Sequence, residues 1–304
     1  MTASSDKRPV VVGIGEVLWD LLPRGKQLGG APANFACHAG KLGAEAYVLS
    51  SVGADSLGRE LLGQLAQLGL DRRFVQRDEL HPTGTVSVEI DELGQPRYVI
   101  HENVAWDHIA FSPQAAELAA RADVVCFGSL AQRSAVSRAT IRSFLAATRK
   151  DCLRVFDVNL RQHDYNREII STGMTTAGVL KLNDEELPTL AALFGIAGSQ
   201  PQVLAELLRQ YSLDLIALTR GDEGALLVTP ERCSSQPGVP AEVVDTVGAG
   251  DAFTAALAMG LLRRLDLDAV NRRACQLASY VCSQPGANPD VPAEIGKSPG
   301  PANP

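Results

Sequence analysis

The sequence has few groups suited to a metal centre or a disulfide framework. Its six cysteines lie at positions 37, 126, 152, 233, 275 and 282 without a C-x-x-C pair, and its five histidines show no metal-ligand spacing. Scattered cysteines are typical of reduced thiols in a core. This pattern disfavours a zinc site, and we expect His38 and His163 to have packing or hydrogen-bonding roles rather than catalytic ones.

The chain also lacks a positive charge balance and a long apolar run. Its formal net charge is −7 and its isoelectric point is near 5.3, which excludes a general binder of nucleic acid or anionic membranes. No apolar run is long enough to span a bilayer, and the start, MTASSDKRPV, lacks the apolar stretch of a secretory signal. We therefore expect a cytoplasmic protein that binds neither nucleic acid nor membranes.

Two common phosphate-binding motifs are missing. The sequence contains no G-x-x-x-x-G-K-[ST], so a Walker-type cradle is absent. The segment GIGEVL has Gly13 and Gly15 but no third glycine at the spacing of a dinucleotide fingerprint, which disfavours Rossmann redox chemistry. Any phosphate site must therefore be built differently.

Alternating apolar segments predict the fold class. With 304 residues, 45% of them hydrophobic, the chain can bury a sizeable core. A period-two pattern at 85–100 predicts a hairpin, exposed on one face, that interrupts the alternation. We expect a three-layer α/β/α fold with a mostly parallel sheet and a small β lid. Strands are predicted within 8–22, 46–53, 123–129, 153–159, 179–183, 213–219 and 225–229, and helices within 29–44, 56–69, 166–173, from 184, 248–264 and 267–283, with one ending near 150.

The nine residues DTVGAGDAF, 245–253, precede an apolar helical run. Glycines at a helix N-terminus let an anion approach the unpaired backbone N–H groups, where the helix dipole favours negative charge. The segment therefore predicts an anion cradle with Asp251 at its mouth. An alternative is that Asp251 is only an early-turn acid that stabilises the helix, and local physics does not decide between the two.

Three further polar motifs follow predicted strands, where ligands of parallel sheets gather. D-x-N-x-R at 157–161 offers an amide and a guanidinium to a polyphosphate, or forms a loop salt bridge. The motif N-x-x-E at 183–186 has two interpretations: it orients a hydrated Mg²⁺ ion, or it forms a capping box at the start of a helix. The motif T-x-G-x-x-G at 219–224 also has two interpretations: it contacts a nucleotide, or its glycines only allow a tight turn between two strands.

Together these motifs resemble those of the ribokinase-like sugar kinases, often called PfkB carbohydrate kinases. GGAPANFACHAGKLGA is similar to the family's N-terminal signature and DTVGAGDAF to its C-terminal one, with the other motifs between them in family order. The resemblance covers roughly residues 9 to 292, and GEVLWDLLP, AWDHI and CSQPGANPDVP are most similar to bacterial fructokinases. Val158 departs from the commonest fructokinase wording, DPNLR.

The resemblance implies a role for each matching position. Asp251 would take the proton from the attacking sugar hydroxyl, and the amides of Gly248, Ala249 and Gly250 would form the anion hole. The implied substrate contacts are Asp20, Gly29, Gly30, Asn34, Asn159 and Arg161, with Arg97 and Tyr98 on the hairpin. The implied nucleotide contacts are Asn183, Glu186, Thr219, Gly221, Gly224 and Asn288.

The implied cofactors are ATP and Mg²⁺, with K⁺ a further expectation. Glu186 would hold Mg²⁺ through water. The residues that match the family's monovalent-cation loops are Asp245, Val247, Val281, Gln284 and Gly286.

The resemblance favours an ATP-dependent kinase acting on a sugar hydroxymethyl group, with fructose as substrate. A 2-keto-3-deoxygluconate kinase, a ribokinase, a nucleoside kinase and a non-catalytic sugar-binding regulator remain as alternatives. We expect one kinase domain over 1–304 with a lid from about 17–33 and 81–108, and a homodimer formed through that lid.

Overall fold

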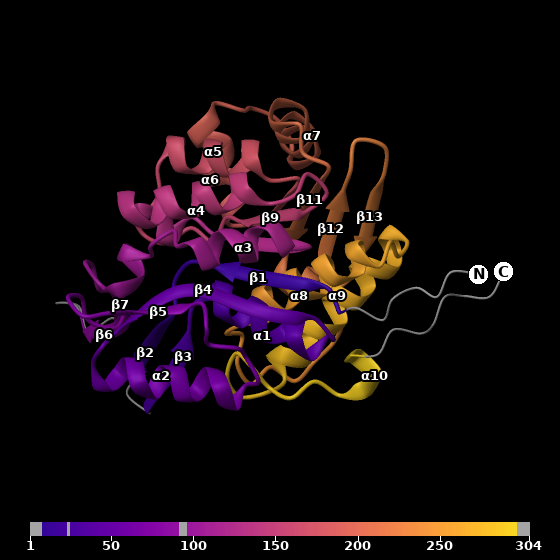
Figure 1. The fold of residues 1–304 in the computed structure, drawn as a ribbon. Helices are drawn as coiled ribbons and strands as arrows, with labels where there is room; N and C mark the ends of the chain where they lie inside the picture. The colour runs from indigo at the N-terminus through magenta and orange to yellow at the C-terminus, as the bar shows by residue number, and fades with distance from the viewer. Residues whose placement is uncertain (1–7, 23–24, 91–95, 297–304) are drawn as a thin grey trace, which may run out of the picture.

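A sheet of nine strands forms the centre of the molecule (Figure 1). The computed structural model describes residues 8–22, 25–90 and 96–296. Neighbouring strands run parallel across most of the sheet. The two strands that come last in the sequence, residues 225–228 and 233–236, pair antiparallel with their neighbours. In spatial order the strands are β13 (Cys233–Gln236), β12 (Ala225–Val228), β11 (Leu215–Thr219), β10 (Val179–Asn183), β9 (Leu153–Asp157), β8 (Val124–Phe127), β1 (Val10–Ile14), β4 (Glu45–Gly53) and β5 (Val75–Asp78).

Helices cover both faces of this sheet. In β1, Val10 and Val12 face one apolar layer and Val11 faces the other, as expected for a strand buried on both sides. The predicted three-layer fold is confirmed. One layer, above the sheet in Figure 1, holds α3 (Pro113–Arg121), α4 (Ala135–Ala147), α5 (Arg167–Thr176), α6 (Glu186–Phe194) and α7 (Gln200–Tyr211); the other holds α1 (Ala31–Lys41), α2 (Ser56–Gln67), α8 (Ala249–Leu262), α9 (Leu267–Cys282) and α10 (Ala293–Gly296).

A second, four-stranded sheet lies beside the first. Its order is β3 (Gly25–Gly29), β2 (Leu18–Leu22), β6 (Thr85–Ile90) and β7 (Pro96–Ile100). The predicted hairpin is confirmed, because β6 and β7 pair antiparallel; the residues that connect them, 91–95, lie outside the described residues. This sheet falls within the segments expected for the lid, whose movement stays a prediction.

The expectation of one buried strand within 8–22 is wrong. The chain leaves the large sheet after Ile14 and starts the second sheet at Leu18, so that one apolar run serves two sheets. Apolar content alone does not reveal the break, because β2 packs Trp19 against α2 and thus also needs apolar residues.

Other elements were not expected from the sequence. The helix predicted from residue 184 is two helices, since α6 ends at Gly195 in a left-handed conformation and α7 follows. Strands β3, β5 and β13 are short and partly polar, which hides the alternating pattern. Short helical turns at Ala105–His108 (η1), Leu130–Arg133 (η2) and Gly221–Glu223 (η3) complete the chain.

We predict that Gly13→Ala destabilises the protein. Strand β1 and helix α1 approach so closely that a methyl group on Gly13 would collide with the backbone carbonyl of Pro32. Overpacking of this kind costs about 1–3 kcal/mol. Gly63→Ala is the matched control, because nothing lies within 4 Å of its added methyl group and alanine favours a helix. Equal melting temperatures of the two variants would contradict the prediction.

Candidate active site

Helix α8 begins as the glycine-rich motif predicts. Gly248 is its N-cap residue, with a φ of 79°, and a methyl group on it would lie 2.6 Å from the Cβ of Ala287. Glycine is therefore required at this position both for the backbone conformation and for the close approach. The N–H of Ala249 makes a long hydrogen bond of 3.3 Å to the carbonyl of Thr246. The first turn of α8 thus presents backbone N–H groups beside Asp251.

The carboxylate of Asp251 points across to α1. Its Oδ2 accepts a hydrogen bond of 2.8 Å from Nδ2 of Asn34, which lies 217 positions away in the sequence. Burial raises the pKa of Asp251 to about 7, and the charge of Asp157 adds to this effect, whereas Asn34, Lys181 and Arg161 oppose it. A carboxylate with these partners is suited to accept a proton at neutral pH, which goes beyond an early-turn stabilising role.

A buried ion pair lies behind the first turn of α8. Nζ of Lys181, on β10, is 3.1 Å from Oδ1 of Asp157, at the end of β9, and the two residues are 7% and 4% exposed. Oγ1 of Thr254 donates to Oδ2 of Asp157 at 3.0 Å. A methyl group on Gly250 would come within 3.2 Å of Nζ of Lys181, so the ammonium group adjoins the helix turn. Lys181 was missed from the sequence, although a lysine inside the apolar strand VLKLN is a signal.

The segment after β9 brings a positive charge to the site. Arg161 is exposed, and its charge lowers the pKa of Asp20, Glu16 and Asp251. No ion pair of Arg161 within 4.0 Å is found among the described residues, so the alternative of a loop salt bridge gains no support. Asn159 precedes it with a φ of 42°.

Val158 has a specific use in this segment. Its N–H donates a hydrogen bond of 3.0 Å to the carbonyl of Lys181, and its side chain is buried. A proline could not make this bond. The departure from the commonest fructokinase wording therefore adds a link between β9 and β10.

The reciprocal hydrogen bonds of a capping box are present in N-x-x-E, although the N-cap residue of α6 is Glu185 and not Asn183. The N–H of Glu186 donates to Oδ1 of Asn183, and the N–H of Asn183 donates to Oε2 of Glu186, both at 2.8 Å. Oε1 of Glu186 also accepts from the N–H of Leu160 at 2.8 Å, and burial raises the pKa of Glu186. The glutamate thus ties α6 to the segment after β9, and its oxygens remain suited to a water of hydrated Mg²⁺.

The turn interpretation of T-x-G-x-x-G is confirmed. Gly221 and Gly224 both have positive φ and flank the short helical turn η3 between β11 and β12. The carbonyl of Thr219 accepts a hydrogen bond of 3.0 Å from the N–H of Asp184. This turn therefore lies next to the N-x-x-E motif.

The expected potassium residues lie in the loop before α8 and in the segment formed by the end of α9 and the loop after it, and Asp245 joins the two. Its carboxylate accepts hydrogen bonds from the N–H groups of Val247, at 3.1 Å, and Gly286, at 3.2 Å. The carbonyl of Val281 accepts from the N–H of Gln284 at 3.0 Å. The donor set is made of oxygens, which fits a hard monovalent cation. Within the described residues no cluster of three or more His, Cys, Asp or Glu side chains is arranged to hold a metal.

Several residues expected to contact the sugar lie on the second sheet and at the start of α1. Asp20 lies on β2 against Gly29 of β3, and burial raises its pKa while Arg161 opposes this. Gly30 is the N-cap residue of α1, and Asn34 lies near the start of the same helix. On β7, Tyr98 is 56% exposed and its carbonyl accepts a hydrogen bond from Gln162; the side chain of Arg97 lies outside what the structure describes.

Glu16 is a second carboxyl group that the sequence reasoning missed. It is 2% exposed, and its Oε2 has no hydrogen-bond partner among the described residues. Burial raises its pKa to about 7; the charge of Asp251 raises it further and that of Arg161 lowers it. The signal in the sequence that could have revealed it is an acidic residue between the two apolar segments that form β1 and β2.

Comparisons with known proteins identify the family. The model of the pfkB family of carbohydrate kinases matches residues 24–294. The chain belongs to this family of carbohydrate kinases. It is 29% identical to the sugar kinase PH1459 of Pyrococcus horikoshii over 85% of this chain and 84% of that protein, and 30% identical to a fructokinase of Salmonella typhimurium over 82% and 83%.

Solved structures agree with this assignment. The structure of PH1459, titled an uncharacterized sugar kinase in complex with ATP, has a TM-score of 0.78 at 28% identity and covers 92% of this chain and 94% of its own. A fructokinase of Vibrio cholerae O395 with bound fructose, ADP and potassium has a TM-score of 0.78 at 25% identity and covers 96% and 98%. The expected fold and the expected activity class, a carbohydrate kinase, are therefore confirmed.

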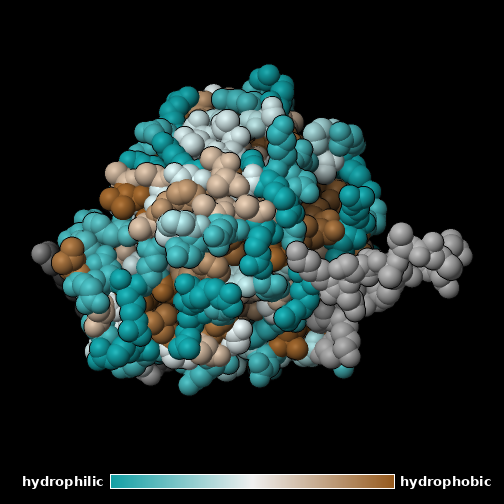
Figure 2. Space-filling model, in the orientation of Figure 1, coloured by the Kyte–Doolittle hydropathy of each residue, from teal (hydrophilic) through white to brown (hydrophobic). Residues whose placement is uncertain are grey.

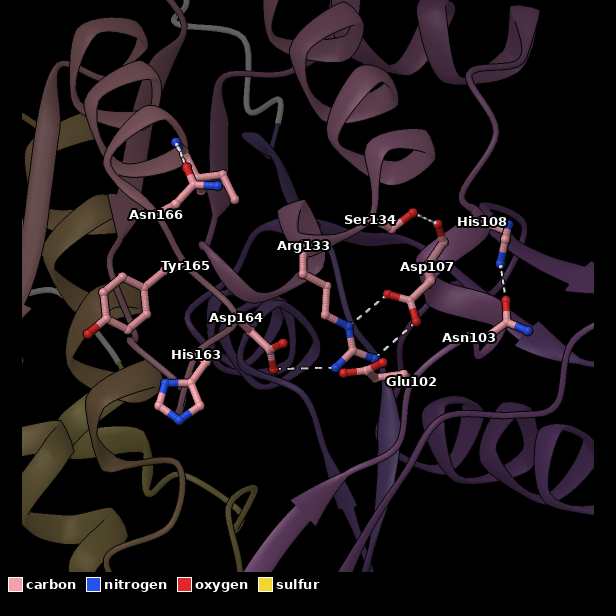
Figure 3. A pocket seen from close by; sticks show the side chains of 11 residues that line it. Glu102, Asn103, Asp107, His108, Arg133, Ser134, His163, Asp164, Tyr165 and Asn166 are labelled. Carbon is pink, nitrogen blue, oxygen red and sulfur yellow. Dashed lines mark hydrogen bonds and ion pairs between the residues drawn. The ribbon is translucent and has the colours of Figure 1, made fainter.

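This kinase also has a polar cavity of about 440 Å³ beside the second sheet (Figure 3). Arg133 lies between Asp107, at 2.9 Å, and Asp164, at 3.4 Å, and stacks on Trp106 with 4.1 Å to the ring centroid. The cavity is lined in part by His163, but Asp251 is not among its lining residues. Arg133 thus joins the base of the second sheet to the segment after β9.

Two remaining expectations concern His38 and membranes. Nε2 of His38 lies 2.9 Å from the carbonyl of Ala287 and burial lowers the pKa of His38 to about 4, so a neutral, hydrogen-bonded histidine is confirmed. Among the described residues, the structure has no helix with the length and apolar character needed to cross a membrane.

We predict that Lys181→Met strongly destabilises the kinase. Removing one partner of a buried ion pair leaves the other charge uncompensated, at about 3–5 kcal/mol. The double variant Lys181→Met/Asp157→Asn should regain much of the loss, because the asparagine can still accept from Thr254. Urea unfolding measures both, and equal stability of the single and double variants would contradict the prediction.

Proposed function

We propose that this carbohydrate kinase transfers the γ-phosphoryl group of ATP to the hydroxymethyl group of D-fructose, giving fructose 6-phosphate and ADP. The observation that carries the proposal is the half-buried carboxylate of Asp251 at the first turn of α8, which accepts a hydrogen bond from Asn34. Burial raises the pKa of this carboxyl group to about 7. Similarity to fructokinases, one of them solved with fructose, supports the choice of sugar.

In the proposed reaction, Asp251 accepts the proton of the attacking hydroxyl. The sugar oxygen forms a bond to the γ-phosphorus while the bond from that phosphorus to the bridging oxygen of ADP breaks. Phosphoryl transfer depends mainly on positioning and on stabilising charge over the phosphoryl oxygens. The N–H groups of Gly248, Ala249 and Gly250, with the nearby ammonium of Lys181, supply that stabilisation without reorganising.

On the sugar side, short polar groups and bare backbone match the hydroxyls of a polyol. Two of the proposed contacts, Asp20 and Gly29, lie on the second sheet, and two, Gly30 and Asn34, lie at the start of α1. Burial raises the pKa of the Asp20 carboxyl group, and the positive charge of Arg161 acts on this group to lower it. Asn159, in the segment after β9, would also contact the sugar, and the β7 residues Arg97 and Tyr98 would close over it. Closure would exclude water that otherwise hydrolyses ATP.

On the nucleotide side, the proposed contacts are the residues expected from the family, Asn183, Glu186, Thr219, Gly221 and Gly224. Glu186 would hold Mg²⁺ through water, and the ion would neutralise phosphate charge. The oxygens around Asp245, Val247, Val281, Gln284 and Gly286 would hold K⁺, as supported by the potassium-bound relative.

The lid sheet also bears on assembly. Its residues Leu21 and Tyr98 are exposed apolar or aromatic side chains, whereas hydrophilic residues separate the apolar patches over the face shown in Figure 2. Dimerisation through the lid stays a prediction, as does the cytoplasmic location.

The first test is ATP consumption with a panel of sugars in Mg²⁺, with and without K⁺. We expect saturable turnover with fructose, well above that with ribose, 2-keto-3-deoxygluconate, glucose or adenosine. Asp251→Asn should lower kcat by about 10²–10⁴-fold and leave ATP binding intact, because an amide cannot accept the proton. Turnover of another sugar would reassign the substrate. A variant that keeps more than about a tenth of kcat would refute the base.

The second test is the pH dependence of kcat/KM. Asp251 must be ionised, and burial raises its pKa to about 7, so activity should rise with pH through about 7 and level off above it. A profile that is flat between about pH 5.5 and 8 would contradict the assignment.

A further inference from the structure

A chain of two hydrogen bonds links the segment after α9 to Asp251. Nδ2 of Asn288 donates to Oδ1 of Asn34 at 2.7 Å, and Nδ2 of Asn34 donates to Oδ2 of Asp251 at 2.8 Å. The three residues belong to the segment after α9, to α1 and to α8. One residue, Asn34, thus separates Asn288 from the carboxylate that acts as the base in the proposed function.

The direction of this chain follows from chemistry. An ionised carboxylate only accepts hydrogen bonds, so Asn34 has to present its NH₂ group to Asp251 and its oxygen away from it. That oxygen then requires a donor, which the NH₂ group of Asn288 provides. If Asn288 were turned over, two amide oxygens would face each other. Each amide therefore fixes the orientation of the next.

The backbone of Asn288 is held in place by the same helix. Nζ of Lys41 donates to the carbonyls of Asn288 and Pro289, both at 2.7 Å, and Nε2 of His38 bonds the carbonyl of Ala287. Asn34, His38 and Lys41 are spaced four and three positions apart, so they lie on one face of α1. This face fixes the 287–289 segment, which in turn packs against Gly248.

We propose that Asn288 is a positioning residue for Asp251: by donating to Asn34 it orients the Asn34 amide so that its NH₂ group stabilises the ionised carboxylate. The proposal rests on the proposed function of Asp251. The nucleotide contact expected for Asn288 stays a separate prediction, because its NH₂ group keeps a second N–H and its Oδ1 has no hydrogen-bond partner among the described residues.

The charges around Asp251 show what this bond must balance. Asp157 on β9 disfavours its ionised form, whereas Lys181 on β10 and Arg161 after β9 favour it. Glu16, between β1 and β2, is the other nearby acid, and the charge of Asp251 raises the pKa of Glu16. The bond from Asn34 acts in the same direction as the two cations. An Asn34 amide that is free to turn would lose part of this effect, and the base would titrate at higher pH.

The test compares the pH profiles of kcat/KM for Asn288→Ala and Asn288→Asp. Asn288→Ala removes the donor, and we expect the acid limb to move up by about one pH unit, with activity about tenfold lower at about pH 6 but within about twofold of wild type at about pH 9. Asn288→Asp keeps the shape and offers an acceptor instead, so its limb should move at least as far. A shift in Asn288→Asp but not in Asn288→Ala would indicate added charge alone and overturn the proposal.

Lys41→Met is the matched control. It loosens the same backbone segment without touching the side-chain relay, so its limb should stay within about 0.3 pH units of wild type. A limb that moves equally in Lys41→Met would assign the effect to the segment and overturn the proposal. A raised KM for ATP at all pH values in Asn288→Ala, with an unmoved limb, would support the nucleotide contact alone and overturn the proposal.

A second readout separates this proposal from the proposed function. A titration of the Asp251 carboxyl by ¹³C NMR, identified with Asp251→Asn, reports its pKa without turnover. If wild type phosphorylates no sugar but Asn288→Ala raises that pKa, the function fails and the relay stands. If wild type is active and the pKa does not move, the relay fails and the function stands.

Discussion

The ammonium group of Lys181, buried among the carboxylates of Asp157, Glu186 and Asp251, is the interaction on which the site depends. Its charge interacts favourably with all three, and the resulting rise in its pKa keeps it protonated in spite of burial. Without this charge the strands β9 and β10 and the first turn of α8 would place acids together with little compensation. The ion pair thus permits the carboxylate of Asp251 at the first turn of α8.

The same arrangement relates stability to chemistry. Asp251 and Glu16 both have a pKa raised to about 7, so each is more easily ionised in the unfolded chain than in the folded one. Their protonated forms favour the folded state at low pH, and this contribution is lost as the pH rises through about 7. The protein therefore loses some stability to hold two carboxyl groups whose pKa values lie near neutral pH. Helix α1 limits that loss through the bond from Asn34.

Much of the fold and several motifs could be predicted because they are local. Apolar periodicity indicated the layers, and the glycines of DTVGAGDAF indicated the start of α8. The split of 8–22 into β1 and β2 could not be predicted, because both strands need apolar residues although they serve different sheets. The bonds that Asn34 makes with Asp251 and with Asn288 join positions more than 200 residues apart. The spacing of residues along one sequence does not reveal which of such distant positions are in contact. Lys181 and Glu16 were missed for a related reason, since each is a charged residue inside or beside an apolar strand whose partners come from elsewhere.

A crystal structure with fructose and a non-hydrolysable ATP analogue tests the central claim most directly. The account predicts that the hydroxymethyl oxygen of fructose lies within hydrogen-bond distance, about 2.6–3.2 Å, of a carboxylate oxygen of Asp251, with the terminal phosphate at the N–H groups of residues 248–250. A complex with fructose or the terminal phosphate bound away from Asp251 would contradict it.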